Sequence, residues 1–111
     1  MGKSSTLLSR EIGRELGMLN ANEEWSAEDN AYVKQVIRDE LESLPSYGVN
    51  VFWDYDDTPE QVFRPLVRYL ATCLPAFGIV FDEAKIEQRL RQLRTAAKMP
   101  YTGSTVKAVY Y

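Results

Sequence analysis

The segment from residue 58 to residue 78, TPEQVFRPLVRYLATCLPAFG, restricts the possible folds of this chain more than any other stretch. It opens with Thr58 as a helix N-cap, Pro59 at the first helical position and Gln61 at the third, the pattern of a capping box. Apolar residues then follow on most sides of the predicted helix. A helix of this kind must be covered by other elements, so we expect it to be central. Pro65 and Pro75 predict a kink near residue 65 and an end between residues 75 and 78.

A first helix is predicted from Ser5 to Met18, because apolar residues recur there on one face of a 3.6-residue period. The residues of this stripe are Leu8, Ile12, Leu16 and Leu19. Gly13 lies within the helix and costs about 1 kcal/mol relative to alanine. We therefore expect the helix to depend on tertiary contacts.

Two further helices have clear boundaries. One begins after Ser26, a natural N-cap followed by acidic residues in the first turn, and stops at the PSYG sequence of residues 45–48. Its apolar stripe consists of Val33, Val36, Ile37, Leu41 and Leu44. The other begins at Asp82 and ends before Pro100, with a stripe formed by Ile86, Leu90, Leu93 and Ala97.

These elements predict an all-α fold, a compact bundle of about four helices over residues 1–99. The 111 residues are enough for one domain with a working core. The sequence VNVFWDYDD, residues 49–57, joins the second helix to the third and could be a short strand, a hairpin arm or a loop.

Residues 100–111 form a predicted extended C-terminal arm. Its last eleven residues, YTGSTVKAVYY, are apolar and strand-like, whereas chain ends are usually polar and frayed. We expect the arm to bind a partner or neighbouring chain by strand-like pairing. The residues expected to make this contact are Tyr101, Val106, Lys107, Val109, Tyr110 and Tyr111.

The composition argues against several classes of function. Thirteen basic and sixteen acidic residues give a net charge of -3, which disfavours wholesale nucleic-acid binding. The chain has no histidine and no glycine-rich phosphate loop, and its single cysteine, Cys73, lies among apolar residues as a small buried hydrophobe would. We therefore predict no catalysis, no cofactor, no metal and no small-molecule substrate. No apolar run approaches the roughly 20 residues of a membrane span, so no membrane partner is expected.

Three polar or aromatic groups allow more than one interpretation. The carboxylates of Asp54, Asp56, Asp57 and Glu60 could bind a cation, but acids gathered before a helix N-terminus explain them better. Arg91, Arg94 and Lys98 form a basic stripe on the fourth helix, which could be a solvated face, could meet an acidic protein surface or could meet DNA. Because the chain is acidic overall, we rank the protein surface above DNA. The aromatic residues of the predicted loops could be lids on the core or interface anchors; they are Trp25, Tyr47, Trp53 and Tyr55.

The order of these features resembles the head-to-tail connector (adaptor) proteins of tailed bacteriophages. More narrowly, it resembles the short-tailed-phage type, also called packaged-DNA stabilisation or tail accessory factors. The resemblance covers SREIGRELGML, the aromatic link VNVFWDYDDTP and PLVRYLATCLPAFGI. An LG turn closes the first helix, as Leu16 and Gly17 do here. The third segment carries an LA…L.P.FG pattern, formed here by Leu70, Ala71, Leu74, Pro75, Phe77 and Gly78.

The resemblance implies a structural, non-enzymatic virion protein at the head–tail junction, assembled in the host cytoplasm. Subunits of such a protein dock beneath the portal protein as a dodecameric ring, extend the channel for packaged DNA, retain the genome and provide a platform for tail or nozzle proteins. The C-terminal arm would lie against the portal, and Arg91, Arg94 and Lys98 would face a neighbouring subunit or the channel. Trp25, Trp53 and Tyr55 would be loop interface anchors.

The alternative interpretation is a small helical DNA-binding or regulatory protein that uses the basic stripe. An enzyme is a third and weaker interpretation. The excess of acidic over basic residues and the apolar arm favour the adaptor over the DNA-binding protein.

Overall fold

The computed structural model describes residues 2–98 as an all-α fold, which confirms the predicted class. The α-helices are α1 (Ser5–Glu15), α2 (Ala27–Ser43), α3 (Glu60–Leu70) and α4 (Glu83–Lys98). Two short 3₁₀ helices, η1 (Leu44–Tyr47) and η2 (Pro75–Phe77), follow α2 and α3. The described residues contain no strand, and the predicted arm at residues 100–111 lies outside them.

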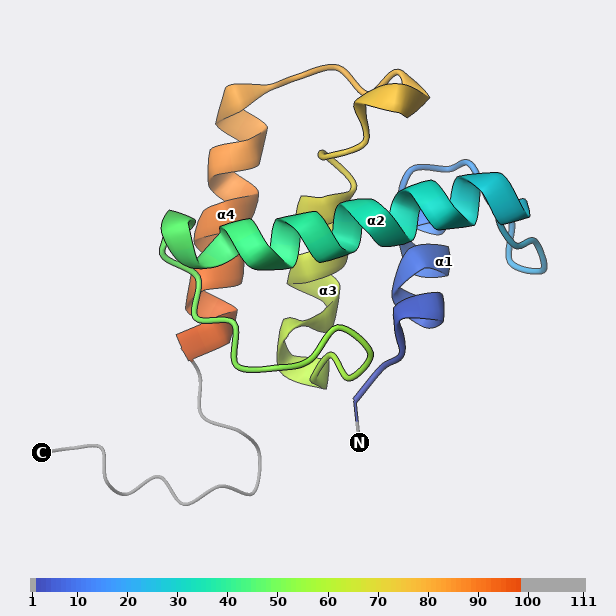
Figure 1. The fold of residues 1–111 in the computed structure, drawn as a ribbon. Helices are drawn as coiled ribbons and strands as arrows, with labels where there is room; N and C mark the ends of the chain where they lie inside the picture. The colour runs from blue at the N-terminus through green and yellow to red at the C-terminus, as the bar shows by residue number, and fades with distance from the viewer. Residues whose placement is uncertain (1, 99–111) are drawn as a thin grey trace, which may run out of the picture.

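The helix α3 lies at the centre of the fold (Figure 1). It packs against α1 on one side and α4 on the other, and α2 crosses all three. Its fully buried residues are Val62, Leu66, Val67 and Leu70. The expectation of a central, covered helix is therefore confirmed.

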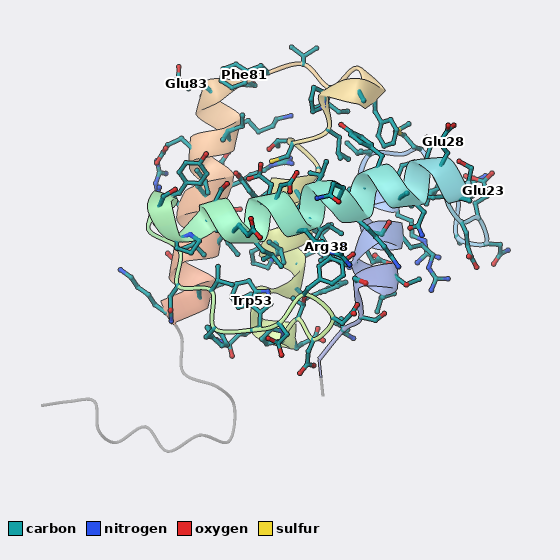
Figure 2. The ribbon with its side chains drawn as sticks, in the orientation of Figure 1. Glu23, Glu28, Arg38, Trp53, Phe81 and Glu83 are labelled. Carbon is teal, nitrogen blue, oxygen red and sulfur yellow. The ribbon has the colours of Figure 1, made fainter. Side chains whose placement is uncertain are left out.

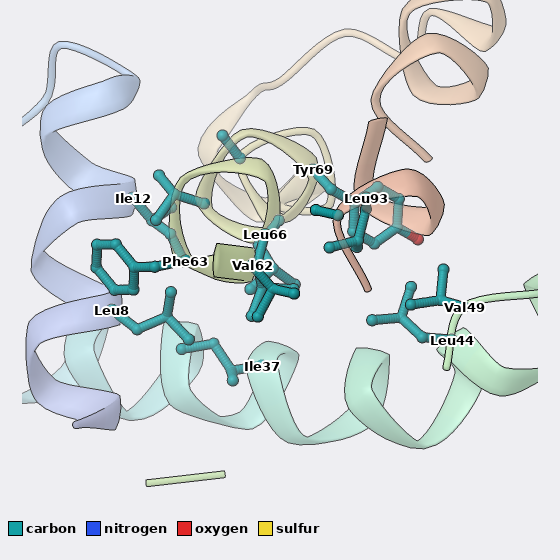
Figure 3. Close-up of a cluster of buried hydrophobic side chains, with 14 of the residues drawn as sticks. Leu8, Ile12, Ile37, Leu44, Val49, Val62, Phe63, Leu66, Tyr69 and Leu93 are labelled. Atoms are coloured by element: carbon teal, nitrogen blue, oxygen red, sulfur yellow. The ribbon is translucent and has the colours of Figure 1, made fainter. Parts of the chain in front are cut away.

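Each of the other helices contributes its predicted stripe to the same core (Figure 3). Leu8 and Ile12 from α1, Ile37 from α2 and Leu93 from α4 are all fully buried. Burying one such side chain stabilises the fold by roughly 1.5–3 kcal/mol. The core is therefore shared by all four helices and not confined to one pair.

The predicted starts of α2 and α4 are confirmed by their capping bonds. Ser26 Oγ accepts a hydrogen bond from the backbone N–H of Asp29 at 3.2 Å. Asp82 Oδ1 accepts one from the backbone N–H of Lys85 at 3.1 Å. Both caps satisfy N–H groups that a helix N-terminus otherwise leaves without partners.

The predicted capping box at Thr58 is wrong. The backbone of Thr58 forms an antiparallel bridge with Lys3, with N···O distances of 2.7 and 2.9 Å. Its side chain is fully buried, and Thr58 Oγ1 has no hydrogen-bond partner among residues 2–98. Pro59 is the N-cap of α3, and the Gln61 side chain donates to the backbone oxygen of Ala96 at 3.3 Å. Pairing with a distant segment thus replaces the local cap.

Two helices end earlier than predicted. α1 ends at Glu15 and is closed by Gly17, whose φ of 75° is left-handed. α3 continues through Pro65 as one helix but ends at Leu70, because the N–H groups of Thr72 and Cys73 donate to oxygens only three residues back. Pro75 then begins η2. The proline that was expected to end α3 therefore starts the following turn.

Residues 49–57 form a loop, which settles the choice left open by their composition. Val49 and Trp53 are buried against the core, whereas Asp54, Asp56 and Asp57 are exposed. A turn closes the segment, with the N–H of Asp57 donating to the oxygen of Asp54 at 3.0 Å. The apolar residues of this loop thus belong to the core, although they form no strand.

Gly13 is required by close packing within α1. A Cβ at this position would lie 2.5 Å from Leu19 Cδ1 and 2.8 Å from Trp25 Cζ2. These contacts are the tertiary support expected for a helix that carries an internal glycine. The loop after α1 folds back onto the helix at this point.

Candidate interaction surfaces

The acidic residues of the 49–57 loop hold the N-terminal segment of the chain. Asp57 Oδ1 accepts a hydrogen bond from the N–H of Gly2 at 2.7 Å, and Asp56 Oδ1 accepts one from the N–H of Ser5 at 3.0 Å. The hydrogen bonds from the Ser5 side chain and backbone lower the pKa of Asp56. Ser5 is the first residue of α1, so Asp56, which precedes α3 in the sequence, also lies at the positive end of α1.

The same segment is also tied to α3 by charge. Lys3 Nζ lies 3.2 Å from Glu60 Oε1 in an ion pair whose two side chains are both exposed. An exposed pair of this kind contributes little, about 0–1 kcal/mol. Within residues 2–98, no group of Asp, Glu, Cys or His side chains is placed to hold a metal ion. Asp56, Asp57 and Glu60 each contact the chain's own N-terminal segment.

The basic stripe on α4 divides into two kinds of residue. Arg91 and Lys98 are exposed, whereas Arg94 is partly buried. Arg94 Nε donates to the backbone oxygen of Tyr47 at 2.9 Å, and Arg94 Nη2 lies 3.3 Å from Glu87 Oε2. Arg94 thus links α4 to η1, and only the two exposed cations are free to meet another molecule.

Trp25 is a lid on the core. Its Nε1 donates to the backbone oxygen of Ser9 at 2.8 Å, and its ring stacks on Phe77 with the centroids 5.1 Å apart. The rings of Phe77 and Tyr32 form a T-shaped contact. These contacts join the loop after α1 to η2, so the indole has a structural role within the subunit.

Trp53 and Tyr55 line an open groove beside α2. The groove is formed by Arg38, Leu41, Glu42, Trp53, Asp54 and Tyr55. Trp53 is only 8% exposed and meets Phe52 edge to face, while the Arg38 guanidinium lies 4.5 Å from the centre of the Tyr55 ring. Neither Trp53 Nε1 nor Tyr55 Oη has a hydrogen-bond partner in the described part of the chain. We call this surface the aromatic groove (Figure 2 labels Arg38 and Trp53).

An apolar pair that sequence reasoning missed lies between η2 and α4. Val80 is 83% exposed and Phe81 is 75% exposed. Figure 2 shows Phe81 beside Glu83 at the N-terminal end of α4. The available signal was the short run IVF, residues 79–81, because it lies outside the apolar stripe of either neighbouring helix. We call Val80 and Phe81 the apolar knob.

Cys73 is partly buried, and its surroundings make it a poor nucleophile. Burial and the nearby carboxylate of Glu40 raise the pKa of the Cys73 thiol to about 11. Tyr69 donates from Oη to Glu40 Oε1 at 2.8 Å, and burial raises the pKa of Tyr69 well above its usual value. The thiol is therefore protonated near neutral pH, and the thiolate is the reactive form.

The predicted arm residues, Tyr101 to Tyr111, lie outside the described residues.

None of the described helices is both long enough and apolar enough to cross a membrane. No protein family, curated protein or solved structure matches the chain in the three comparisons.

Proposed function

We propose that the chain is a structural head-to-tail adaptor of a tailed bacteriophage. In this role it docks beneath the portal protein as one subunit of a ring, extends the channel for packaged DNA and retains the genome. It also offers a platform for tail proteins. The proposal rests on the resemblance of the sequence to short-tailed-phage adaptors and on the place of the resembling residues in the fold.

The observation that carries the proposal is where those residues lie. Gly17 and Gly78 both adopt left-handed φ angles, 75° and 79°, at the turns that follow α1 and η2. Leu70 and Leu74 are buried members of the hydrophobic core. The resembling residues therefore include the glycines that close the turns after α1 and η2 and two leucines of the core. Adaptors that carry the same pattern would be expected to place it at the same turns.

In the proposed role, the helical domain and the arm have separate tasks. The arm at residues 100–111 follows the C-terminal end of α4 and would lie against the portal. Arg91 and Lys98 are exposed on α4 and would face a neighbouring subunit or the channel. Positive charge on that face would counter the negative charge of the DNA phosphates in the channel.

A pull-down with purified portal tests the proposal. The portal encoded in the same genome is immobilised, and the full chain is compared with a variant that lacks residues 103–111. We expect the full chain to be retained and the truncated chain to be washed away. Failure of the full chain to bind, or equal retention of both chains, would contradict the proposed docking.

A DNA-binding or regulatory protein is the second candidate, favoured by the exposed cations Arg91 and Lys98. It makes a distinct prediction, because binding through phosphate contacts weakens steeply as the salt concentration rises. Retention of duplex DNA at low salt that is lost at high salt would favour this candidate. An adaptor should bind free duplex poorly at every salt concentration.

A further inference from the structure

Charge is divided unevenly between α2 and the other helices. Residues 20–57, which contain α2 and the loops on either side of it, include ten acidic and two basic residues, a net charge of -8. The other described residues, 2–19 and 58–98, include six acidic and ten basic residues, a net charge of +4. Because α2 crosses the other three helices (Figure 1), the negative charge is concentrated on the side that α2 forms. We call this side the acidic face.

The aromatic groove lies on the acidic face. Glu42 and Asp54 line it, and both residues are exposed. Neither carboxylate forms an ion pair with any of residues 2–98. The rim of the groove therefore has two carboxylates that a cation from another molecule can reach.

The two basic residues of the acidic face do not neutralise the groove. The Arg38 guanidinium lies 4.5 Å from the centre of the Tyr55 ring and also interacts with the carboxylate of Asp56. Lys34 lies one turn earlier in α2, where its Nζ donates to Thr6 Oγ1 at 2.9 Å. Once Asp56 is counted, three carboxylates surround one guanidinium at the groove. A cationic ligand is therefore attracted there, and the phosphates of nucleic acid are repelled.

The groove also contains two buried donors without acceptors. The Trp53 side chain lines the groove and is more than nine-tenths buried, and its Nε1 has no hydrogen-bond partner in the part of the chain that the structure describes. The same is true of Tyr55 Oη. Buried tryptophan and tyrosine side chains normally have a partner for their polar atom. A ligand that fills the groove is therefore expected to supply acceptors, which the carbonyl oxygens of a peptide do.

We propose that the aromatic groove binds an extended segment of a partner protein in which lysine or arginine lies next to apolar residues. Backbone oxygens of the segment accept from Trp53 Nε1 and Tyr55 Oη. The aliphatic stem of the basic side chain packs on Leu41, and its charged head lies against Glu42 and Asp54, since long basic side chains bury their stems and keep their heads in polar surroundings. The inference goes beyond the adaptor role and does not depend on it.

Binding of this kind should weaken as the salt concentration rises. Salt screens charges on exposed surfaces, and the screening length falls from about 10 Å at 0.1 M to about 3 Å at 1 M. The attraction between the acidic face and a basic segment is therefore expected to decrease over this range. A purely apolar contact would not be weakened by salt.

An NMR titration of the full chain tests the proposal. The chain has two tryptophans, so two indole N–H signals are expected, and the variant Trp25→Phe assigns them. The probe is a blocked pentapeptide in which leucine alternates with lysine and arginine. The controls carry glutamine or glutamate in place of both basic residues. We expect the basic peptide to shift the Trp53 signal in a saturable way, the glutamine peptide to bind several-fold more weakly and the glutamate peptide not to bind.

Two results of this titration would overturn the proposal. One is a failure of the basic peptide to shift the Trp53 signal, or an equal shift with the glutamate peptide. The other is a Trp53 signal that moves with protein concentration alone, because a second copy would then occupy the groove. The adaptor role is tested separately with the portal, so it stands or falls independently of both results.

Charge variants locate the contact on the acidic face. Glu42→Gln/Asp54→Asn removes both carboxylates from the groove and should weaken binding of the basic peptide several-fold. The matched control Glu24→Gln/Glu28→Gln removes the same charge near the other end of α2, where Figure 2 labels Glu28, and should bind almost as the wild type does. All four positions are exposed, so both variants should fold normally. Equal weakening in the two variants would show a general attraction to the acidic face and would refute a site at the groove.

Discussion

Arg94 reaches from α4 to η1 and donates a 2.9 Å hydrogen bond from Nε to the backbone oxygen of Tyr47. The same guanidinium lies 3.4 Å from the place that a Cβ on Gly48 would occupy. One member of a stripe that looked uniform in the sequence is therefore part of the packing between two elements. Arg91 and Lys98 are exposed and make no comparable side-chain contact with any of residues 2–98.

Arg94→Gln should destabilise the protein more than Arg91→Gln or Lys98→Gln. The loss of this solvent-exposed hydrogen bond costs about 0.5–1.5 kcal/mol, whereas substitutions at exposed positions usually stay within about 0.5 kcal/mol. Urea unfolding of the three single variants measures the difference. Equal stabilities would show that the bond to Tyr47 contributes nothing in solution.

Gly13→Ala should destabilise the protein, although alanine is the better helix former by about 1 kcal/mol. The added methyl group would overlap Leu19 and Trp25, and overpacking a closed site costs about 1–3 kcal/mol. Thermal unfolding gives the sign. The double variant Gly13→Ala/Leu19→Ala should lose less unfolding free energy than the sum of the losses in the two single variants. The alanine side chain at position 19 is shorter than leucine and removes part of the overlap. Strict additivity, or a stabilised Gly13→Ala, would contradict this packing.

Local signals predicted those elements whose determinants are close in the sequence. Ser26 and Asp82 could be predicted as caps because each accepts a hydrogen bond from an N–H group only three residues further along the chain. Thr58 has the same local pattern, but its backbone pairs with Lys3, which lies far away in the sequence near the N-terminus. A sequence pattern contains no information about that partner until the fold is known. The hydrogen bonds of Asp57 to Gly2 and of Asp56 to Ser5 were not predicted, for the same reason.

The candidate surfaces also depend on contacts between residues that are distant in the sequence. That Trp25 is a lid depends on Ser9 and Phe77, which belong to separate elements, so composition could not choose between lid and anchor. The exposure of Val80 and Phe81 depends on how early α3 ends and where α4 starts. Apolar residues next to a predicted helix are normally assigned to the core, and only the structure shows that this pair is left outside it.

The stability contributed by Cys73 should disappear in alkaline solution. Its thiol pKa rises from 9.0 to about 11 on folding, mainly because of burial. The unfolded chain loses this proton first as the pH rises, so the contribution is complete below pH 9 and is lost between pH 9 and pH 11. The loss amounts to about 2–3 kcal/mol. We expect the difference in unfolding free energy between wild type and Cys73→Ala to shrink over this range, whereas parallel pH profiles would exclude the shift.

Deleting residues 103–111 should leave the melting temperature of the helical domain nearly unchanged. The core that the structure describes is built from side chains of α1 to α4 and the segments that join them. Differential scanning calorimetry of the full and truncated chains makes the comparison. A large drop in melting temperature would show that the arm packs on its own domain. It would then contradict the proposal that the arm binds a partner.

Native mass spectrometry of the chain mixed with the portal of the same genome tests the adaptor role most directly. We predict a complex in which the number of bound chains rises to the number of portal subunits, with only bare portal observed when residues 103–111 are deleted. The free chain measured alone should show no closed ring. A spectrum that contains only bare portal and free full-length chain would contradict the account.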